Sequence, residues 1–420
     1  MKRPLRILYY NTFLPMNAPE GMVSRQFLAA AQALEGWSLT TVPSFKLTRV
    51  PSEGAKSRRH KQFVPASLRK SMRTFLSPIS PYPVGPYFHA KKMRAQLAET
   101  IQQNDPFDMM FLHLSQGDLA VLIELVEQID LPLVLRVPAP LAYEADEVLH
   151  RYMSKADRQR ELTLYQKADT ILVISEGMKQ ILCAQGVPAE KIFVYPNGLD
   201  FSAFTVDEAK GAEIRHELGL DDRFVVGYVG SFWPGNDMMT LLQAWQRIEA
   251  VEEMADLLLV GDGALAAQYR EISDELQLKN CHWVGRVPHT EVPNYIAAMN
   301  VGIGPYTQKA VNFVSPLKVM EYAALGRPVV ATDGGQIKEI IEDGKTGYIY
   351  NPHDVDQLVD RILMLISKPG NAKEMGLKGR EWIETWYSWD KIAQDVLDLC
   401  QSVVEQKSGS NQKRLRELTN

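Results

Sequence analysis

Short apolar segments that suit buried strands alternate with helix-like segments along most of the chain. In the first half the strand-like segments cover residues 6–10, 109–114, 133–137, 170–174 and 192–195. Helix-like patterns at 161–167 and 176–185 fall between them. Strands separated by helices pair in parallel, because each connecting helix crosses back over one face of the sheet. The alternation therefore predicts an α/β fold of parallel sheets flanked by helices.

The pattern stops once and then restarts, which predicts two domains. A turn at 196–198 is followed by a lapse in apolar periodicity until about Ile214. Strand-like segments then recur at 224–229, 257–260, 282–284, 301–303, 329–331 and 347–350. A chain of 420 residues is long enough for two domains. We expect two Rossmann-like domains that face each other, 1–200 and 201–385, with helices at about 386–404 completing the first and a disordered polar tail at 405–420.

Capping residues predict where two of the helices begin. Residues 11–22 are rich in Pro and Gly and are expected to form a loop, after which Ser24 caps a helix that runs to about Leu34. Thr290 is the expected cap of a helix with Val292 and Tyr295 on its apolar face.

Composition is that of an ordinary globular protein, with 45% hydrophobic and 23% charged residues. The start of the chain has no apolar core long enough for a signal peptide, and no run approaches the ~20 apolar residues of a membrane span. Three cysteines lie far apart, with neither metal-ligand nor disulfide spacing. We therefore expect a cytoplasmic protein with reduced thiols.

Charge is concentrated in residues 46–94, which hold twelve Lys or Arg and one acid, Glu53. Aromatic residues and prolines are interspersed among these basic residues. Such a segment suits an anionic membrane surface or an anionic acceptor, and it equally suits a solvated insertion. Nucleic acid is not an expected partner, because no recognition motif accompanies the charge.

Residues 315–335 carry the strongest functional signal. Ser315 is a good N-cap, Pro316 suits the first helical position, and Gly326 is expected to end the helix before a buried strand at 328–331. Lys318 lies in the first turn, where the helix dipole is already positive, so this helix start predicts an anion site for phosphate. Glu321, one turn later, can accept from two neighbouring hydroxyls. Phosphate and a diol together suggest a nucleotide, and the alternative is a solvated Lys–Glu pair.

Five further segments, in order, support a family resemblance. They are Ala-Asp-Thr-Ile-Leu-Val-Ile-Ser-Glu at 168–176, Lys-Ile-Phe-Val-Tyr-Pro-Asn-Gly-Leu-Asp at 191–200, Val-Val-Gly-Tyr-Val-Gly-Ser at 225–231, Val-Gly-Asp-Gly at 260–263 and Val-Gly-Arg-Val at 284–287. With residues 315–335, the chain resembles a family 4 glycosyltransferase, which has the GT-B fold and transfers a sugar from a nucleotide-sugar with retention of configuration. The resemblance covers most of the chain and is strongest from Glu161 onward.

The resemblance implies roles for particular residues. Glu321 would bind the ribose hydroxyls, and the loop before it would bind the diphosphate. Gly21, in the first strand–loop–helix unit, would approach the same phosphates from the other domain. Lys318, Arg136 and His113 are the candidate catalytic residues, although a structural role for His113 stays open. The other expected donor-binding residues are Gly230, Ser231, Asn236, Val287, Ser315 and Leu317.

The chain departs from the family pattern at several charged positions. Phe313 stands where many relatives carry an acid, and a known variant of this pattern has the Ser-Pro-x-Lys start seen at 315–318. Ser231 and Asn236 stand where a basic pair is frequent, and Pro138 where a histidine is frequent. The departing diphosphate would then depend on backbone amides and Lys318. No Asp-x-Asp motif is evident, so we expect no cofactor and no obligatory metal.

Two other classes of function stay open at this point. One is a catalytically weakened nucleotide-sugar-binding partner subunit, which the missing basic pair favours. The other is a sugar epimerase or phosphorylase with the same fold. The expected partners are a nucleotide-sugar donor and a saccharide or lipid-linked acceptor. The sequence does not indicate the base, the sugar, the acceptor, the linkage or the oligomeric state.

Overall fold

The computed structural model describes residues 4–11, 19–42, 85–104, 106–115, 119–202 and 204–419. Most of the basic segment, residues 46–84, lies outside the described residues, and so does its proposed membrane contact. The chain divides into two compact units. One comprises Met1–Arg136, Ser154–Thr170 and Leu399–Asn420, and the other comprises Val137–Met153 and Ile171–Asp398.

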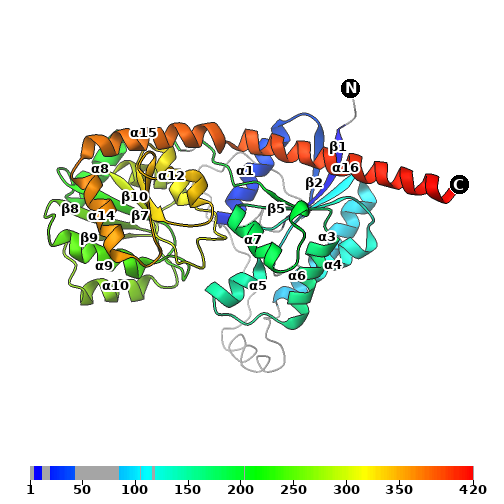
Figure 1. The fold of residues 1–420 in the computed structure, drawn as a ribbon, viewed down its shortest axis with the longest axis horizontal. Helices are drawn as coiled ribbons and strands as arrows, with labels where there is room; N and C mark the ends of the chain where they lie inside the picture. Colours follow the sequence, from blue (N-terminus) through cyan, green and yellow to red (C-terminus); the bar gives the residue numbers. More distant parts are fainter. Residues whose placement is uncertain are drawn as a thin grey trace, which may run out of the picture. The chain divides into compact units, whose positions relative to one another are not determined.

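The first sheet has six strands in the order β2-β1-β3-β4-β5-β6. Its strands β1 and β2, which pair in parallel, are labelled in Figure 1. The strands are β1 (Leu5–Tyr10), β2 (Trp37–Val42), β3 (Met109–His113), β4 (Leu133–Arg136), β5 (Thr170–Val173) and β6 (Ile192–Val194). All residues of β3, β4 and β5 are buried, as expected for parallel strands covered on both faces. The five expected strands are confirmed. The sixth, β2, was not predicted, because its apolar residues are separated by serine and threonines.

The helical elements that follow these strands are α1 (Pro19–Ala33), α3 (Gly85–Gln103), α4 (Leu119–Gln128), α5 (Leu141–Tyr143), a π-helical turn η2 (Glu144–Val148), α6 (Lys155–Lys167), α7 (Glu176–Ala184) and a 3-10 turn η3 (Ala189–Lys191). The expected start of the first helix at Ser24 is wrong. The helix begins at Pro19, whose fixed φ suits a first helical position. Ser24 is buried inside the helix, and Gly21 lies in the first turn rather than in a loop.

The second sheet is also six-stranded and parallel, in the order β12-β11-β10-β7-β8-β9. Its strands are β7 (Phe224–Val229), β8 (Ala255–Val260), β9 (Cys281–Gly285), β10 (Val301–Gly304), β11 (Val329–Thr332) and β12 (Gly347–Tyr350). All six expected strands are confirmed. The chain winds one way from β7 to β9 and the other way from β10 to β12. The carboxyl ends of β7 and β10 therefore form the switch point where α/β sheets bind ligands.

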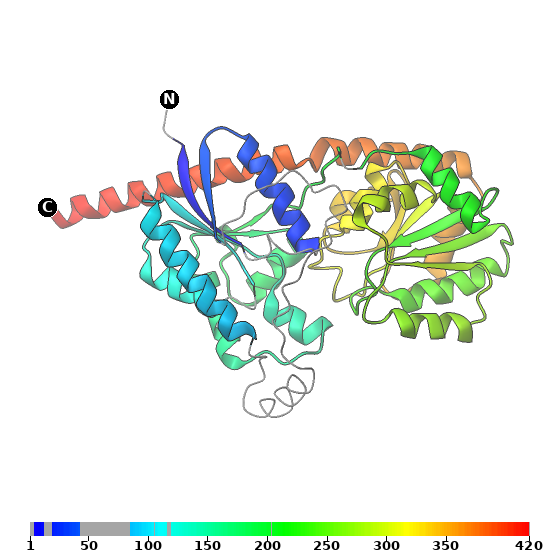
Figure 2. The same cartoon turned by 180° about the vertical axis from the view of Figure 1, so that it is seen from behind.

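Helices cover both faces of this second sheet (Figure 2). They are α8 (Glu208–Leu218), α9 (Met238–Glu249), α10 (Ala266–Glu275), α11 (Val292–Ala297), α12 (Leu317–Ala324), α13 (Ile337–Ile340), α14 (Val355–Ile366) and α15 (Pro369–Trp386). One core cluster gathers the apolar faces of α11 and α12, and the other those of α9 and α14. Thr290 does not cap α11. It lies within a 3-10 turn, η4 (His289–Glu291), that leads directly into the helix.

The end of the chain also differs from expectation. Helix α16 (Trp389–Thr419) continues through residues 405–419, where we expected disorder. These residues include Gln, Lys, Arg, Leu and Glu, which favour helix even without an apolar face. None of the helices that the structure describes is both long enough and apolar enough to cross a bilayer.

Candidate functional site

The loops that follow β7 and β10 are joined to each other at the switch point. The Asp237 amide donates to the Pro305 carbonyl over 3.1 Å, and the Thr307 amide donates to the Gly235 carbonyl over 3.0 Å. An isolated antiparallel bridge between Asn236 and Tyr306 lies between these contacts. The side chains of both loops are therefore held in fixed positions beside the start of α12.

The Lys318 ammonium group lies among neutral side chains at this place. Its Nζ donates to Asn236 Oδ1 over 2.9 Å and lies 3.4 Å from the Tyr228 hydroxyl. It is also 4.6 Å and 4.7 Å from the ring centroids of Tyr228 and Tyr306, within the range of cation–π attraction. We call Tyr228, Gly230, Asn236, Tyr306 and Lys318 the Lys318 site.

Burial lowers the pKa of Lys318 to about 7, and the negative charge of Glu321 opposes that shift. The desolvation cost of the ammonium group exceeds what the rings and the amide return to it. An anion that enters the site would supply the missing counter-charge. The geometry therefore suits a phosphate better than the solvated Lys–Glu pair of the alternative interpretation.

Gly230 brings the backbone close to this ammonium group. Its φ of 151° lies in a region that side chains disfavour, and an added Cβ would lie 3.0 Å from Lys318 Cε. A Cβ on Gly261, which follows β8, would lie only 1.9 Å from the Gly230 carbonyl oxygen. Both glycines are needed for the loop after β7 to approach the lysine.

Ser231 and Asn236, which stand where a basic pair is frequent, have different roles in the structure. Ser231 is exposed, and its carbonyl accepts from the Tyr228 hydroxyl over 2.8 Å and from Asn236 Nδ2 over 2.7 Å. Asn236 is buried and uses its amide oxygen for Lys318. A single cation from α12 thus lies against the loop in which the family frequently carries two.

The start of α12 differs in detail from the prediction. Pro316 occupies the N-cap position, and no side chain caps the helix. The Ser315 hydroxyl is buried and has no hydrogen-bond partner among the described residues. The Leu317 amide donates to the Ser315 carbonyl over 2.9 Å, so this N–H is already in use. Gly326 ends the helix in the left-handed region, as expected, with φ 68°.

Glu321 is buried one turn along α12, and its partner was not foreseen. His289 Nε2 lies 3.6 Å from Glu321 Oε1. The nearby carboxylate of Glu321 raises the pKa of His289, and partial burial opposes the shift. The histidine ring also meets Phe204 edge-on, with centroids 5.8 Å apart.

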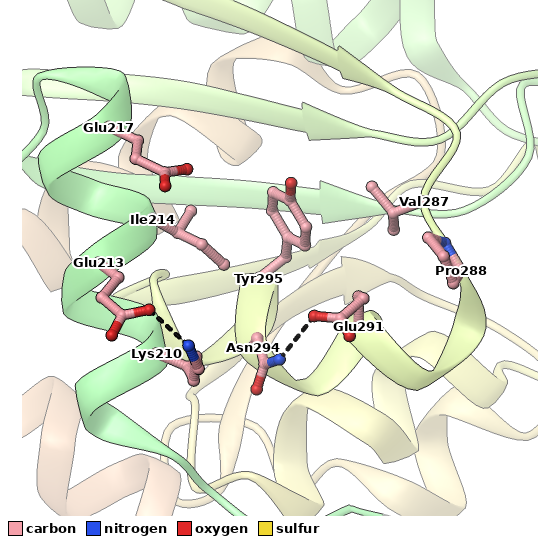
Figure 3. A pocket seen from close by; sticks show the side chains of 9 residues that line it. All are labelled: Lys210, Glu213, Ile214, Glu217, Val287, Pro288, Glu291, Asn294 and Tyr295. Atoms are coloured by element: carbon pink, nitrogen blue, oxygen red, sulfur yellow. Dashed lines mark hydrogen bonds and ion pairs between the residues drawn. The ribbon is translucent and has the colours of Figure 1, made fainter. Parts of the chain in front are cut away.

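Val287 lines a shallow pocket of about 230 Å³ between α8 and α11 (Figure 3). The wall from α8 presents Glu213 and Glu217, and the other wall presents Glu291. Lys210 is already paired with Glu213 over 2.6 Å. This acidic lining does not suit a phosphate. The pocket that Val287 lines is therefore not a candidate for binding the diphosphate.

The remaining candidates belong to the first unit. His113 and Arg136 are neighbours in the register of β3 and β4, and both are buried. His113 Nε2 lies 3.4 Å from the Tyr9 hydroxyl, which accepts from Asn11 Nδ2 over 3.0 Å. Tyr9, Asn11, His113 and Arg136 form the Arg136 cluster, at the carboxyl ends of β1, β3 and β4. Gly21 lies in α1 of the same unit.

Burial lowers the pKa values of both basic groups in this cluster. The pKa of Arg136 falls to about 10, so the guanidinium stays charged at neutral pH. The pKa of His113 lies well below its usual range, first through burial and then through the charge of Arg136. His113 is therefore neutral near pH 7, which excludes a role for it as a cationic acid there.

Tyr228, Tyr306 and His289 are the site residues that sequence reasoning missed. Tyr228 is in β7 and Tyr306 comes two residues after β10, both next to the switch point. A tyrosine close to the carboxyl end of each of two neighbouring strands was the available signal. His289 offered no such signal, because its contact with Glu321 depends on the path of the loop after β9.

Two protein-family models match consecutive parts of the chain. A model described as Glycosyltransferase Family 4 matches residues 49–203, and one described as Glycosyl transferases group 1 matches residues 223–368. Together these matches cover most of the chain, and the boundary between them falls where the apolar pattern lapses.

Curated relatives include a GDP-mannose-dependent alpha-(1-6)-phosphatidylinositol monomannoside mannosyltransferase of Mycobacterium tuberculosis, 26% identical over 55% of this chain and 61% of the relative. The capsular polysaccharide biosynthesis glycosyltransferase CapM of Staphylococcus aureus is 27% identical over 58% of this chain and 64% of the relative. The chain thus spans less than two thirds of the length of each.

Solved structures support the fold over nearly the whole chain. Anabaena Alr3699/HepE in complex with UDP-glucose matches with a TM-score of 0.67 and 17% identity, over 95% of this chain and 100% of that one. The sucrose-phosphate synthase of Thermosynechococcus elongatus matches with a TM-score of 0.69 and 19% identity, over 96% and 100%. These likenesses confirm the expected GT-B fold. The two family models, which together match most of the chain, show that it belongs to the family 4 glycosyltransferases.

Proposed function

We propose that the chain transfers a sugar from a nucleotide-sugar donor to a hydroxyl acceptor, with retention of configuration, in the synthesis of bacterial-type surface glycans or lipid-linked saccharides. The observation that carries the proposal is the position of Lys318 at the start of α12, with Glu321 one turn later. Supporting it, one structural neighbour was solved with UDP-glucose, and relatives are named for lipid-linked and capsular glycans.

The proposed chemistry follows from the charge that develops on the leaving group. When the bond to the sugar breaks, the diphosphate gains negative charge. An ammonium group already held by Asn236 and two aromatic rings can stabilise that charge without first reorganising. The unpartnered Ser315 hydroxyl is available as a further donor. We assign this stabilisation to Lys318 rather than to a metal ion.

Arg136 and His113 are the proposed acceptor-side residues. A permanently charged Arg136 can orient an acceptor oxygen. Neutral His113 can accept or donate a hydrogen bond near pH 7.

A turnover assay tests the proposal. The protein is incubated with UDP-, GDP- and ADP-sugars, with and without lipid-linked saccharide acceptors and EDTA, and nucleoside diphosphate release is measured. We expect one nucleotide class to turn over, with EDTA having no effect and NMR showing the donor's anomeric configuration in the product. An inverted product would contradict retention, and loss of turnover in EDTA would contradict the assignment to Lys318.

A catalytically weakened binding subunit is the second candidate function. It is favoured by the neutral side chains of Ser231 and Asn236 and by Phe313, where the family frequently carries charge. The same assay discriminates, because this candidate predicts measurable nucleotide binding with no turnover of any donor.

Association with an anionic membrane through residues 46–94 is a separate proposal that rests on sequence alone. Co-sedimentation with vesicles that contain phosphatidylserine tests it. Replacing Arg58, Arg59 and Lys61 with serine should weaken binding by about 1 kcal/mol for each residue that contacts the surface. Equal binding by the variant and the unaltered protein would contradict the proposal.

A further inference from the structure

We propose that His289 is a positioning residue that holds the Glu321 carboxylate in place for a ribose diol and makes donor binding depend on pH. This inference rests on the proposed function, because it takes the ligand of Glu321 to be the diol of a nucleotide. It goes further in naming the group that orients this carboxylate.

The contact between the two side chains carries the argument. Glu321 is only 6% exposed, and burying a carboxylate is costly unless it has a partner. His289 Nε2 lies 3.6 Å from Oε1, as an ion pair when the ring is protonated. A carboxylate has about four acceptor positions on two oxygens. A contact at Oε1 therefore leaves Oε2 available for the ligand.

His289 itself is placed by its surroundings. The turn η4 follows Pro288, whose extended backbone (φ −57°, ψ 145°) directs the chain into the turn. The edge-on contact with Phe204 fixes one side of the ring. About half of the side chain is exposed, with 49% of its surface accessible, so protons exchange freely with solvent.

Among the charged groups around His289, Glu321 is the one that faces the ring and favours its protonated form. From α12, Glu321 faces the ring, and on the histidine's own turn Glu291 is engaged by Asn294 Nδ2 over 2.9 Å. The segment before α8 contributes the uncharged ring of Phe204. Glu321 interacts electrostatically with Lys318 on its own helix and with the hydroxyl groups of Tyr306 and Tyr322.

The sign of the pH effect follows from this arrangement. Because Glu321 raises the pKa of His289, protonated His289 is favoured in the folded protein. The ion pair is present at low pH and is lost as pH rises through that raised pKa. Donor binding should weaken in the same direction. Lys318 loses its proton in a similar range, so the two effects must be separated by a variant.

The experiment compares the unaltered protein with His289→Gln, which keeps a hydrogen-bond donor and removes the titration. Kd values for UDP, GDP and ADP, and for their 2′,3′-dideoxy counterparts, are measured by calorimetry between pH 6 and pH 8.5. The ratio of the variant's Kd to that of the unaltered protein cancels the contribution of Lys318. We expect a ratio of roughly 3 to 10 at pH 6, up to the equivalent of one pKa unit, which falls to about 1 at pH 8.5.

Two controls make the result specific to the diol. The ratio should stay near 1 at every pH for the dideoxy nucleotide, which has no ribose hydroxyls to offer Glu321. His216→Gln removes a histidine that is 83% exposed on α8 and paired with Asp221, and it should leave all Kd values unchanged. In turnover, His289→Gln should raise KM for the donor at pH 6 and leave kcat unaltered.

The failures of the two proposals are distinguishable. If the unaltered protein binds none of the three diphosphates, the proposed function fails and the inference fails with it. If it binds one and the ratio is independent of pH, or lies below 1 at pH 6, the inference alone is overturned. An equal ratio for the normal and dideoxy nucleotides also overturns it, because the effect would then not pass through the diol.

Discussion

Lys318 and Arg136 offer a comparison between a partly buried and a fully buried cation, each near the carboxyl ends of parallel strands and each beside a tyrosine. Burial lowers both pKa values, to about 7 for Lys318 and to about 10 for Arg136. The lysine can therefore lose its proton under physiological conditions, and the arginine cannot. The comparison teaches that the positive charge of the Lys318 site is set by what binds there, whereas the charge of the Arg136 cluster is permanent.

The surroundings of the two cations explain this difference further. Lys318 lies against two aromatic faces and one amide oxygen, which stabilise an ammonium group only partly. Arg136 interacts with the Tyr9 hydroxyl, which is neutral at neutral pH because burial raises its pKa to about 12. We therefore expect the first cation to bind the anionic donor and the second to act on a neutral acceptor.

The largest expected effect comes from removing the lysine. Lys318→Ala should weaken nucleoside diphosphate binding by about 1.5–3 kcal/mol, the scale of a charge-assisted hydrogen bond. Calorimetry measures the change, and Lys345→Ala is the matched control, because Lys345 is exposed and paired with Glu342. Unchanged affinity in Lys318→Ala would show that Lys318 does not bind the diphosphate, and the comparison with Arg136 would fail.

The substitution Arg136→Lys tests the proposed role of Arg136 on the acceptor side. A lysine keeps the charge but lacks the planar array of donors, so we expect kcat to fall about tenfold with the Kd for nucleotide unchanged. Steady-state kinetics and calorimetry on the same preparation separate these terms. A fall in nucleotide affinity equal to the fall in kcat would show that the two cations do not have separate roles.

The predicted titration of Lys318 gives an effect of intermediate size. Below about pH 7 the free ammonium group is charged, and above it the group is increasingly neutral, so a bound diphosphate must draw in a proton. Between pH 7 and pH 8 the affinity should fall about fivefold, with proton uptake seen as a binding enthalpy that depends on the buffer. Lys318→Arg should abolish that uptake. The pH dependence left in this variant would belong to groups other than Lys318, such as His289 and the terminal phosphate of the ligand.

The smallest expected effect restores a missing charge. Ser231 is exposed in the loop after β7, so Ser231→Arg should tighten diphosphate binding by only about 0.5–1 kcal/mol. Calorimetry on the variant, alone and combined with Lys318→Ala, checks this value. A loss of affinity would indicate that the loop requires a neutral residue there.

The fold was largely predictable because its signals are local. Eleven of the twelve strands were expected from apolar runs, and only β2, with serine and threonines between its apolar residues, was missed. Helix boundaries were less predictable. Ser24 can cap a helix, but the helix begins earlier at Pro19, and capping residues alone do not decide between such starts.

The part of the site that lies within a single helix was predictable from the sequence. Lys318 and Glu321 share α12, so their spacing was visible in the sequence. Tyr306, Asn236 and His289 meet them only through loops whose ends are fixed by strand order. A contact between residues far apart in the chain leaves no periodicity to detect. Asn236 was expected to bind the donor, but its hydrogen bond to Lys318 was not foreseen.

The account depends most on the assignment of the Lys318 site to a diphosphate. A crystal structure of the protein with bound UDP or GDP tests it most directly. The account predicts a phosphate oxygen within hydrogen-bond distance of Lys318 Nζ and the ribose hydroxyls on Glu321. A nucleotide bound elsewhere, with Lys318 still in contact with Asn236 and Tyr228 and not with a phosphate, would contradict it.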